Sequence, residues 1–197
     1  LCRQLGFHFK IAHCNFKLRG DESDRDEEFV RRLAESYKAE LLVRRFDTKL
    51  YAREKKLSVQ VAARELRYEW FYQIPSVDYI LTAHHADDNI ETLLMNFFKG
   101  SGIGGLHGIL PKRGRLVRPL LFASREDIRS FAEENGLTCV EDSSNLSDKY
   151  SRNYVRHQLI PAIEKIYPHL RENLRNNISR FTDIELLYRQ AVDLHKK

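Results

Sequence analysis

The sequence predicts an α/β protein built on a doubly wound, mostly parallel sheet and followed by a helical C-terminal segment. Short apolar stretches typical of strands alternate with longer amphipathic stretches typical of helices up to about residue 141. Serine residues that can cap a helix stand directly before two of the amphipathic stretches. From about Tyr150 onward the pattern is helical throughout. These three observations indicate strands joined by helical crossovers.

The strands are predicted from their apolar character. In the first, Phe7, Phe9 and Ile11 alternate with polar residues, as expected for a strand with one buried face. The opening LCRQLG resembles the last turn of a helix, so we expect the first element of the fold to precede residue 1. The predicted strands are 7–14, 41–46, 78–83 and the short stretch 137–141.

The helices are predicted from caps and from apolar residues at helical spacing. Ser23 or Asp24 is expected to cap the helix that runs to residue 40, and Ser58 the helix 59–74, with a charged connector over 47–57 between the flanking elements.

Further along the chain, a helix is predicted after residue 85, with Ile90, Leu93, Leu94, Phe97 and Phe98 on one packed face. A glycine-rich loop is expected to follow over 98–109. Ser124 and Asp127 have the spacing of a capping box for the next helix, which Gly136 closes. The region 169–197 is expected to form one long helix or two.

Composition is that of an ordinary globular protein, with 42% hydrophobic and 31% charged residues among 197. No apolar run approaches the ~20 residues of a membrane helix, so no membrane partner is expected. Three cysteines without a CxxC pair favour a reducing, cytoplasmic location. Residues 151–197 hold nine Lys/Arg against five Asp/Glu. This excess favours a polyanion such as nucleic acid, and a solvated helix surface equally.

The densest group of ionisable residues is AHHADDNIET, residues 83–92. A zinc pair on a helix needs histidines at i and i+4, whereas His84 and His85 are adjacent. Asp88 and Glu91 are three positions apart, and Asp87 and Glu91 four, so these acids can group at the first turn of the helix. Such acids suit either Mg²⁺ with nucleotide phosphates or a substrate ammonium group. The alternative is simple capping, because acids favour a helix N-terminus.

Other candidate residues are basic or lie at strand ends. In parallel α/β folds ligands bind beyond the carboxyl ends of the strands, where the segments 13–24 and 84–88 are expected. Arg64 and Arg67 lie one helical turn apart and suit phosphate oxygens, or salt bridges with neighbouring glutamates. Arg152 and Arg156 suit an RNA backbone, or again simple salt bridges.

Five stretches occur in an order that resembles a known family. The chain is similar to the catalytic domain of tRNA(Ile)-lysidine synthetases, members of the N-type ATP pyrophosphatase (PP-loop) group, over roughly residues 7–161. The stretches are AHCNFKLRGDESDRDEEFV, SVQVAARELRYEWF, AHHADDNIETLLMNFFKGSGIGGLHGI, RPLLFASREDIRSFA and EDSSNLSDKYSRNYVRHQLIP.

The resemblance implies an adenine nucleotide alpha hydrolase-like fold and a reaction. ATP, with Mg²⁺, would adenylate C2 of the wobble cytidine in tRNA(Ile) with a CAU anticodon. The side-chain amine of free L-lysine would then displace AMP to give lysidine. The resemblance also implies a catalytic domain over 1–157, a helical linker or start of a tRNA-binding region over 158–197, and a homodimer as one assembly to be tested.

The resemblance assigns functions residue by residue. Catalytic residues would be His84, His85, Asp88 and Glu91, with Asp88 also at Mg²⁺. ATP would be bound by His13, Cys14, Asn15, Arg64, Arg67, Lys99 and Gly100. Substrate or tRNA would be contacted by Arg118, Asp142, Asn145, Arg152, Asn153 and Arg156.

One expected motif, the phosphate-binding SGGxDS loop, does not occur in the 197 residues and is expected shortly before residue 1. Three alternatives remain open. A tRNA thiolation enzyme of the same group would need cysteine pairs, and a small-molecule amidating synthetase would not need the basic helical tail. A non-catalytic RNA-binding domain is the third.

Overall fold

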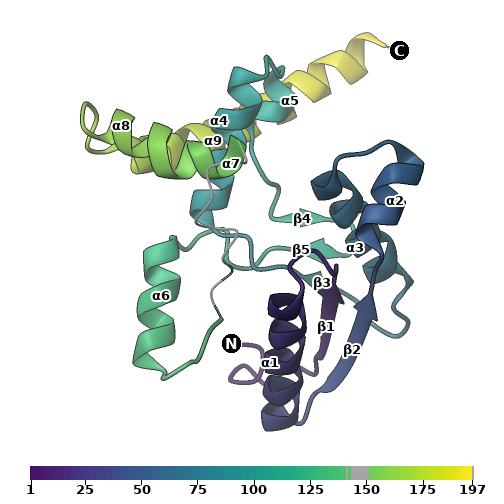
Figure 1. Cartoon of the computed structure of the whole chain (residues 1–197). Helices are drawn as coiled ribbons and strands as arrows, with labels where there is room; N and C mark the ends of the chain where they lie inside the picture. Colours follow the sequence, from purple (N-terminus) through teal and green to yellow (C-terminus); the bar gives the residue numbers. More distant parts are fainter. Residues whose placement is uncertain (141, 143–150, 197) are drawn as a thin grey trace. The chain divides into compact units, whose positions relative to one another are not determined.

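The computed structural model describes residues 1–140, 142 and 151–196 (Figure 1). Two compact units divide the chain, Leu1–Val77 and Asp78–Lys197. The boundary expected at residue 157 therefore falls inside the second unit. Among the described residues, no helix is long and apolar enough to cross a membrane.

The first unit consists of a parallel strand pair with helices. Its elements are β1 (Lys10–Asn15), α1 (Asp21–Tyr37), β2 (Glu40–Arg45), α2 (Thr48–Lys55) and α3 (Val59–Gln73). β1 and β2 run in register from Lys10 opposite Glu40 to Asn15 opposite Arg45, with α1 as the crossover between them. An ion pair of 2.8 Å between Lys10 and Glu40 ties the two strands at their start.

The second unit is mostly helical. Its elements up to α6 are β3 (Ile80–Leu81), α4 (Ala86–Phe98), α5 (Ile103–Leu106), β4 (Lys112–Arg113), β5 (Leu116–Val117) and α6 (Arg125–Glu134). The elements that follow are α7 (Ser151–Tyr154), the π-helix η2 (Val155–Leu159), α8 (Ile160–Glu164) and α9 (Leu170–His195). β3 pairs with β5 in parallel, and β4 pairs with β5 as an antiparallel hairpin.

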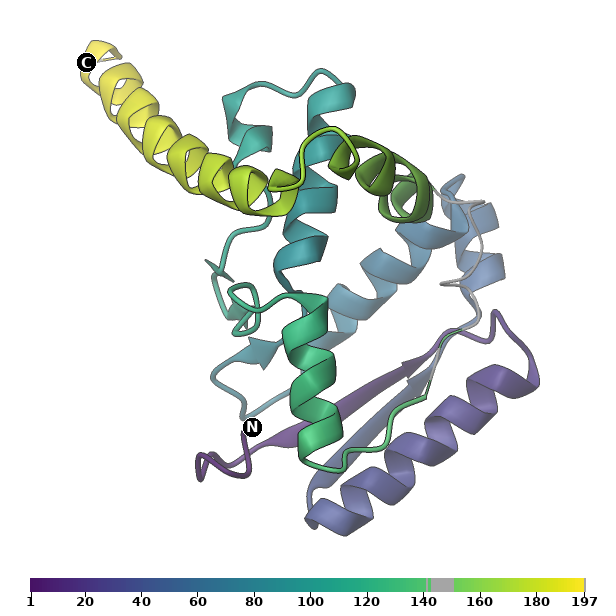
Figure 2. The ribbon, with the colours of Figure 1, turned by 90° about the vertical axis from the view of Figure 1, so that its left-hand side faces the viewer.

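The core of the second unit joins α4 to the C-terminal helices. Ile90 and Leu93 of α4 are buried against Val155, Ile160 and Ile178. Figure 2 shows α9 as one continuous helix, so the region 169–197 forms one helix rather than two over its described residues. This core includes residues on both sides of position 157. The C-terminal helices therefore pack directly against α4.

The α/β class, the parallel strand pairing and the helical C-terminal segment are confirmed. In the described residues the pairing is divided between two hydrogen-bonded sheets, β1–β2 and β3–β5–β4. Ser58 and the Ser124–Asp127 capping box begin α3 and α6 as predicted.

Other boundaries differ from the predictions. α1 begins after Gly20 rather than after a Ser23 or Asp24 cap, because the Ser23 hydroxyl accepts the N–H of Arg19 instead. The first strand starts only at Lys10, which leaves Phe7 64% exposed. Phe97 and Phe98 were wrongly placed on the packed face of α4, since both lie at its C-terminal end and are exposed.

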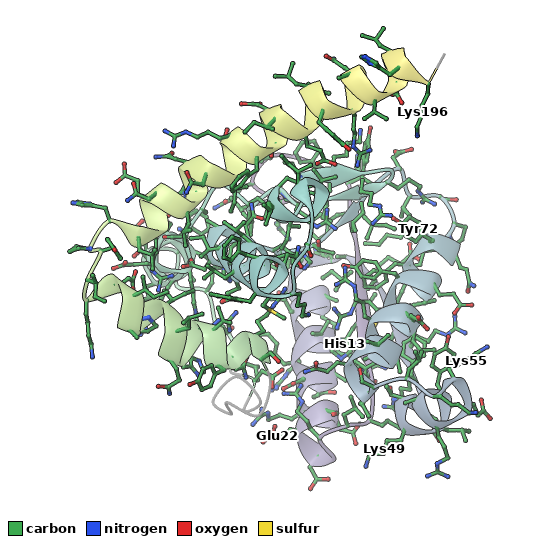
Figure 3. All side chains as sticks on the ribbon, turned by 90° about the horizontal axis from the view of Figure 1, so that it is seen from above. His13, Glu22, Lys49, Lys55, Tyr72 and Lys196 are labelled. Carbon is green, nitrogen blue, oxygen red and sulfur yellow. The ribbon has the colours of Figure 1, made fainter. Side chains whose placement is uncertain are left out.

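Three further predictions were wrong in detail. The connector 47–57 contains α2, which Asp47 caps by accepting the N–H of Leu50 at 3.0 Å. Lys49 and Lys55 of α2 are exposed (Figure 3). The charged residues of this stretch therefore form the solvent-facing side of a helix and do not indicate an irregular loop. The glycine-rich loop contains the short helix α5. The strand expected at 137–141 is not formed by its described residues, 137–140.

Candidate active site

The first turn of α4 is fixed by a reciprocal pair of hydrogen bonds. His85, the residue before the helix, accepts the N–H of Asp88 through Nδ1 at 3.4 Å, and its own N–H donates to Asp88 Oδ2 at 3.1 Å. The N–H of Ala86 donates to the carbonyl of Ala123 at 2.8 Å, which ties the helix start to the chain ahead of α6. Capping therefore accounts for part of the arrangement predicted around Asp88.

Glu91, one turn further along α4, is a fully buried carboxylate held by arginine. Arg156 donates to it twice, from Nε to Oε1 at 2.6 Å and from Nη2 to Oε2 at 3.1 Å. Nε of Arg152 lies 3.7 Å from Oε2. This two-pronged geometry is the one in which arginine binds a carboxylate most firmly. Because both oxygens are occupied and buried, Glu91 is placed to orient Arg156 rather than to contact a ligand.

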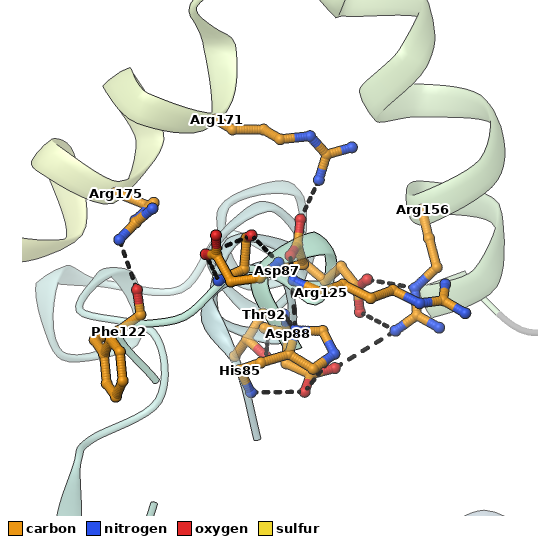
Figure 4. Close-up of polar contacts among 12 residues, drawn as sticks. His85, Asp87, Asp88, Thr92, Phe122, Arg125, Arg156, Arg171 and Arg175 are labelled. Carbon is orange, nitrogen blue, oxygen red and sulfur yellow. Dashed lines mark hydrogen bonds and ion pairs between the residues drawn. The ribbon is translucent and has the colours of Figure 1, made fainter. Parts of the chain in front are cut away.

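Arg156 also connects Glu91 to Asp88. Its Nη2 lies 3.4 Å from Asp88 Oδ1 (Figure 4). Burial lowers the pKa of Arg156, but its hydrogen bonds to Glu91 and the charges of Glu91 and Asp88 raise the pKa overall. The guanidinium therefore stays charged and holds the two acids on one side of α4.

The π-helix η2 brings this arginine to the acids. Arg152 on α7 and Arg156 on η2 both point at α4, where the second Nη of Arg152 donates to the Thr92 hydroxyl at 2.9 Å. Single π-turns inside helices are frequent at functional sites because they re-aim side chains. Asn153 between them is buried.

Asp87 anchors the other side of the site. It accepts a hydrogen bond from Arg171 of α9 and the backbone N–H of Arg125 at 2.8 Å (Figure 4). Arg171 in turn donates to Glu164 at 2.7 Å. Arg171 was not predicted at the site, and Asp87 was grouped with the other acids but assigned no function of its own. The acids of the motif were visible in the sequence, but no local pattern indicated which distant arginine would pair with each.

The remaining predicted residues of the second unit fall into different places. His84 lies beside the site, with Nδ1 2.9 Å from the Thr82 hydroxyl. Lys99 and Gly100 follow the opposite end of α4, about 20 Å along a helix of this length, and are not brought to the acids.

Arg118 and the residues from the later motif differ in burial. Arg118 is buried, and its Nη1 donates to the carbonyl of Leu110 at 2.5 Å. Asp142 is half-buried, and Asn145 lies outside the described residues. In the described ranges, no group of three His, Cys, Asp or Glu side chains has the arrangement of a metal site.

In the first unit, the predicted ATP-binding segment ends in a buried asparagine. Nδ2 of Asn15 donates to Asp24 and Glu27, both at 3.0 Å, and Oδ1 accepts the N–H of Lys17. Burial lowers the pKa of His13, so its imidazole is neutral near pH 7. Burial also raises the pKa of Cys14 to about 11, which keeps that thiol protonated.

Glu27 is a residue that the sequence interpretation missed. It is 2% exposed and accepts two hydrogen bonds from Arg45, each 2.9 Å, besides those from Arg31 and Asn15. The hydrogen bond from Arg45 is the main reason that the pKa of Glu27 falls to about 2. Glu27 thus ties α1 to the end of β2, next to Asn15.

The arginines of α3 are partnered by aromatic rings rather than by their neighbouring glutamates. The guanidinium of Arg64 lies 4.9 Å from the ring centre of Tyr68, and that of Arg67 lies 5.2 Å from the ring centre of Phe16. Such stacking leaves the edges of a guanidinium available for hydrogen bonds.

Comparisons with known proteins identify a family and relatives over most of the chain. The PP-loop domain family matches residues 1–163. A tRNA(Ile)-lysidine synthase from Bacteroides thetaiotaomicron is 44% identical over 191 residues, covering 95% of this chain and 45% of that protein. The tRNA(Ile)-lysidine synthase of Parabacteroides distasonis is 43% identical over 197 residues, covering 98% of this chain and 45% of that protein.

Similarity also extends to a solved structure. A U34-tRNA thiolase from Methanococcus maripaludis superimposes with a TM-score of 0.62 at 17% identity, covering 87% of this chain and 60% of that one. This likeness concerns the fold alone. The chain spans less than half the length of the two lysidine synthases that it matches. The match over residues 1–163 shows that the chain belongs to the PP-loop domain family.

Proposed function

We propose that this chain is the catalytic part of a tRNA(Ile)-lysidine synthase. The observation that carries the proposal is the cluster of acids and arginines at the start of α4, in a chain 44% identical over 191 residues to an enzyme of that name. Membership of the PP-loop family implies that ATP is bound.

The proposed reaction has two steps. The C2 oxygen of the wobble cytidine attacks the α-phosphorus of ATP, a P–O bond forms, and pyrophosphate leaves. The ε-amine of free L-lysine then attacks C2, a C–N bond forms, and the C2–O bond breaks as AMP leaves with that oxygen. The attacking amine loses its protons, so the site must bind an ammonium group and also accept a proton from it.

Asp88 and His85 are suited to these two tasks. Arg156 donates to Asp88 Oδ1 at 3.4 Å, a longer contact than the 2.6 Å bond that Arg156 makes to Glu91. An incoming ammonium can therefore pair with Asp88 without freeing Arg156 from Glu91. Nδ1 of His85 accepts the N–H of Asp88 at 3.4 Å, so it is the unprotonated ring nitrogen, and we propose that it gives up this long contact to accept a proton from an amine bound at Asp88.

Glu91 and Arg156 act as positioning residues in this proposal. Glu91 fixes the guanidinium, and Arg156 places its positive charge beside Asp88. Arg152 lies one helical turn before Arg156. We propose that these two arginines face the tRNA substrate, whose phosphates are suitable partners for a guanidinium.

ATP and Mg²⁺ are proposed to enter together. The described residues do not supply a three-ligand metal site, but Mg²⁺ commonly uses one or two carboxylates together with substrate phosphates. Asp88 fits that limited demand. When bound, Mg²⁺ would neutralise charge on the phosphates. For the first unit, we propose that His13, Cys14, Asn15, Arg64 and Arg67 contribute to nucleotide binding.

A thiolation enzyme is the second candidate, from the same group of folds. Thiolation requires a reactive sulfur, and the raised pKa of Cys14 makes its thiolate scarce near pH 7. This observation favours lysine transfer over sulfur transfer by that residue.

The proposal is tested with the protein expressed from its complete gene. The protein is incubated with tRNA(Ile) transcript bearing a CAU anticodon, Mg-ATP and radiolabelled lysine, and label in the tRNA is counted. We expect ATP-dependent labelling that disappears when uridine replaces the wobble cytidine. Binding of the transcript without any lysine incorporation would instead favour thiolation or a non-catalytic RNA-binding function.

A further inference from the structure

A pocket of about 370 Å³ lies in the second unit beside α4, on the side of α9. Its lining combines apolar side chains, among them Ile109, Leu121 and Ile178, with polar ones that include the exposed residues Arg175 and Asp183. Pockets of a few hundred Å³ that combine apolar lining with a few polar groups suit small ligands or parts of larger ones. The acids proposed for lysine do not line it.

The loop that forms one wall is fixed in place. The side-chain oxygen of Asn89 accepts the N–H of Ile109 at 2.5 Å. Gly108, with a φ of 67°, passes so close to Asn89 that a Cβ there would lie 2.1 Å from the same oxygen. A larger residue here would push the Asn89 oxygen away from the N–H of Ile109, so glycine preserves the bond that fixes this wall before any ligand binds.

Phe122 stands at the mouth of the pocket with an exposed ring. It is 73% exposed, although the next residue, Ala123, is buried. Its carbonyl accepts a hydrogen bond from Arg175 at 2.8 Å (Figure 4), and the carbonyl of Ala123 accepts one from Ala86. The backbone is thus held on both sides, and a flat aromatic face is presented to solvent on a rigid support.

The surrounding segment is strongly basic. Between Glu91 and Glu126 the sequence contains six Lys/Arg residues and no Asp/Glu. Two of them, Lys112 and Arg113, are exposed on the β4–β5 hairpin, which begins directly after the pocket residues Leu110 and Pro111. A basic surface interleaved with an exposed aromatic ring is typical of proteins that bind single-stranded nucleic acid.

We propose that the pocket beside Phe122 binds an unpaired nucleobase of the RNA substrate. Phe122 stacks on the base, Asp183 accepts from an amino group on its edge, and Arg113 and Arg175 contact the adjoining phosphates. Unpaired RNA bases are commonly recognised in this way, by aromatic stacking combined with hydrogen bonds to the base edge. This inference rests on the proposed function, because it takes tRNA as the partner.

The test measures binding of a fluorescein-labelled anticodon stem-loop RNA with a CAU anticodon, by anisotropy, to the full-length gene product. Phe122→Ala is expected to weaken binding about five- to hundredfold, while Phe122→Trp retains it because a flat ring remains. Phe98→Ala is the matched control, since Phe98 is similarly exposed, at 63%, on the far end of α4. Arg113→Ala should weaken binding and reduce the salt slope by about one unit.

The outcomes separate this inference from the proposed function. Equal affinity of Phe122→Ala, Phe98→Ala and the unmodified protein overturns the nucleobase site and leaves lysine transfer standing. Loss of affinity in Phe122→Ala, in a protein that adds no lysine to tRNA, supports the site and overturns the proposed function. No RNA binding by the unmodified protein overturns both.

Discussion

Two helices of the second unit begin with the same arrangement and differ in what surrounds it. At the start of α4 the pair is His85 and Asp88, and at the start of α6 it is Ser124 and Asp127. In both, the cap side chain accepts an N–H of the first turn and the aspartate accepts the N–H of the cap residue. Capping alone therefore does not distinguish an active site from an ordinary helix start.

The difference lies in the partners beyond the cap. Asp127 is exposed, and Ser124 is its main partner. Asp88 is half-buried and shares Arg156 with the fully buried Glu91, and Asp87 beside it pairs with Arg171. Histidine is also an unusual cap, because Ser, Thr, Asp and Asn are preferred. A departure from the best cap, together with distant arginines, is why we propose the start of α4 as the functional site.

Arg156→Ala should have the largest effect. It leaves Glu91 buried without its two-pronged partner, so we expect the free energy of unfolding to fall by about 3–5 kcal/mol and lysine transfer to be lost. Urea denaturation followed by circular dichroism measures the first, and tRNA labelling the second. Arg189→Ala is the control, because Glu185 keeps His107 at 3.2 Å when Arg189 is removed. If the free energy of unfolding falls no further in Arg156→Ala than in Arg189→Ala, the buried charge of Glu91 does not depend on Arg156.

His85→Ser separates capping from chemistry at the same position. Serine is the better cap, so thermal stability should be kept or slightly raised. Lysine transfer should fall about 100-fold or more, because the imidazole that accepts the proton is gone. Single-turnover labelling of tRNA at saturating lysine measures this rate. An unchanged rate of lysine transfer would show that His85 only caps the helix.

Ser124→Ala tests the ordinary helix start. The N–H of Asp127 loses its acceptor at 3.0 Å, and the melting temperature should fall by about 2–4 °C. Lysine transfer per folded molecule should stay as in the unmodified protein. Differential scanning calorimetry gives the first value, and a substantial drop in transfer would mean that α6 contributes to the site.

The smallest effect concerns pH. Hydrogen bonds from Ser124 lower the pKa of Asp127 below its usual value of 3.8. A depressed carboxyl pKa means that the folded state binds the proton less tightly than the unfolded state. The contribution of Asp127 is therefore present above pH 3.8 and lost as the pH falls through its folded pKa. We expect Asp127→Asn to be less stable than the unmodified protein at pH 6, with the difference in melting temperature shrinking towards pH 3.

The elements predicted best were those with a local signal. Ser58 stands directly before α3, and the Ser124–Asp127 spacing identified the start of α6. α2 was missed because its eight residues are mostly polar, and its cap, Asp47, lies in a charged stretch that also fits a loop. The hairpin β4–β5 was missed because strands of two residues are too short to show alternation.

The site was predicted only in part for a similar reason. The acids of residues 83–92 form one local motif, so their grouping at the start of α4 followed from helical spacing. Arg156 lies 65 positions from Glu91, and Arg171 lies 84 positions from Asp87. Such pairs depend on how α4 packs against the C-terminal helices, which no local pattern records. Likewise, Arg118 was expected at a substrate, and only the fold shows that it is buried against the carbonyl of Leu110.

The most direct test of the account compares the two aspartates that occupy the same capping position. Asp88→Asn and Asp127→Asn each keep an oxygen that can accept the cap N–H, so each helix start should survive. Full-length protein is incubated with tRNA(Ile) transcript, Mg-ATP and radiolabelled lysine, and kcat/KM for lysine is determined. The account predicts a fall of about 10- to 100-fold for Asp88→Asn, as expected for losing a charged contact to the amine, and no change for Asp127→Asn. Equal values for the two variants would contradict it.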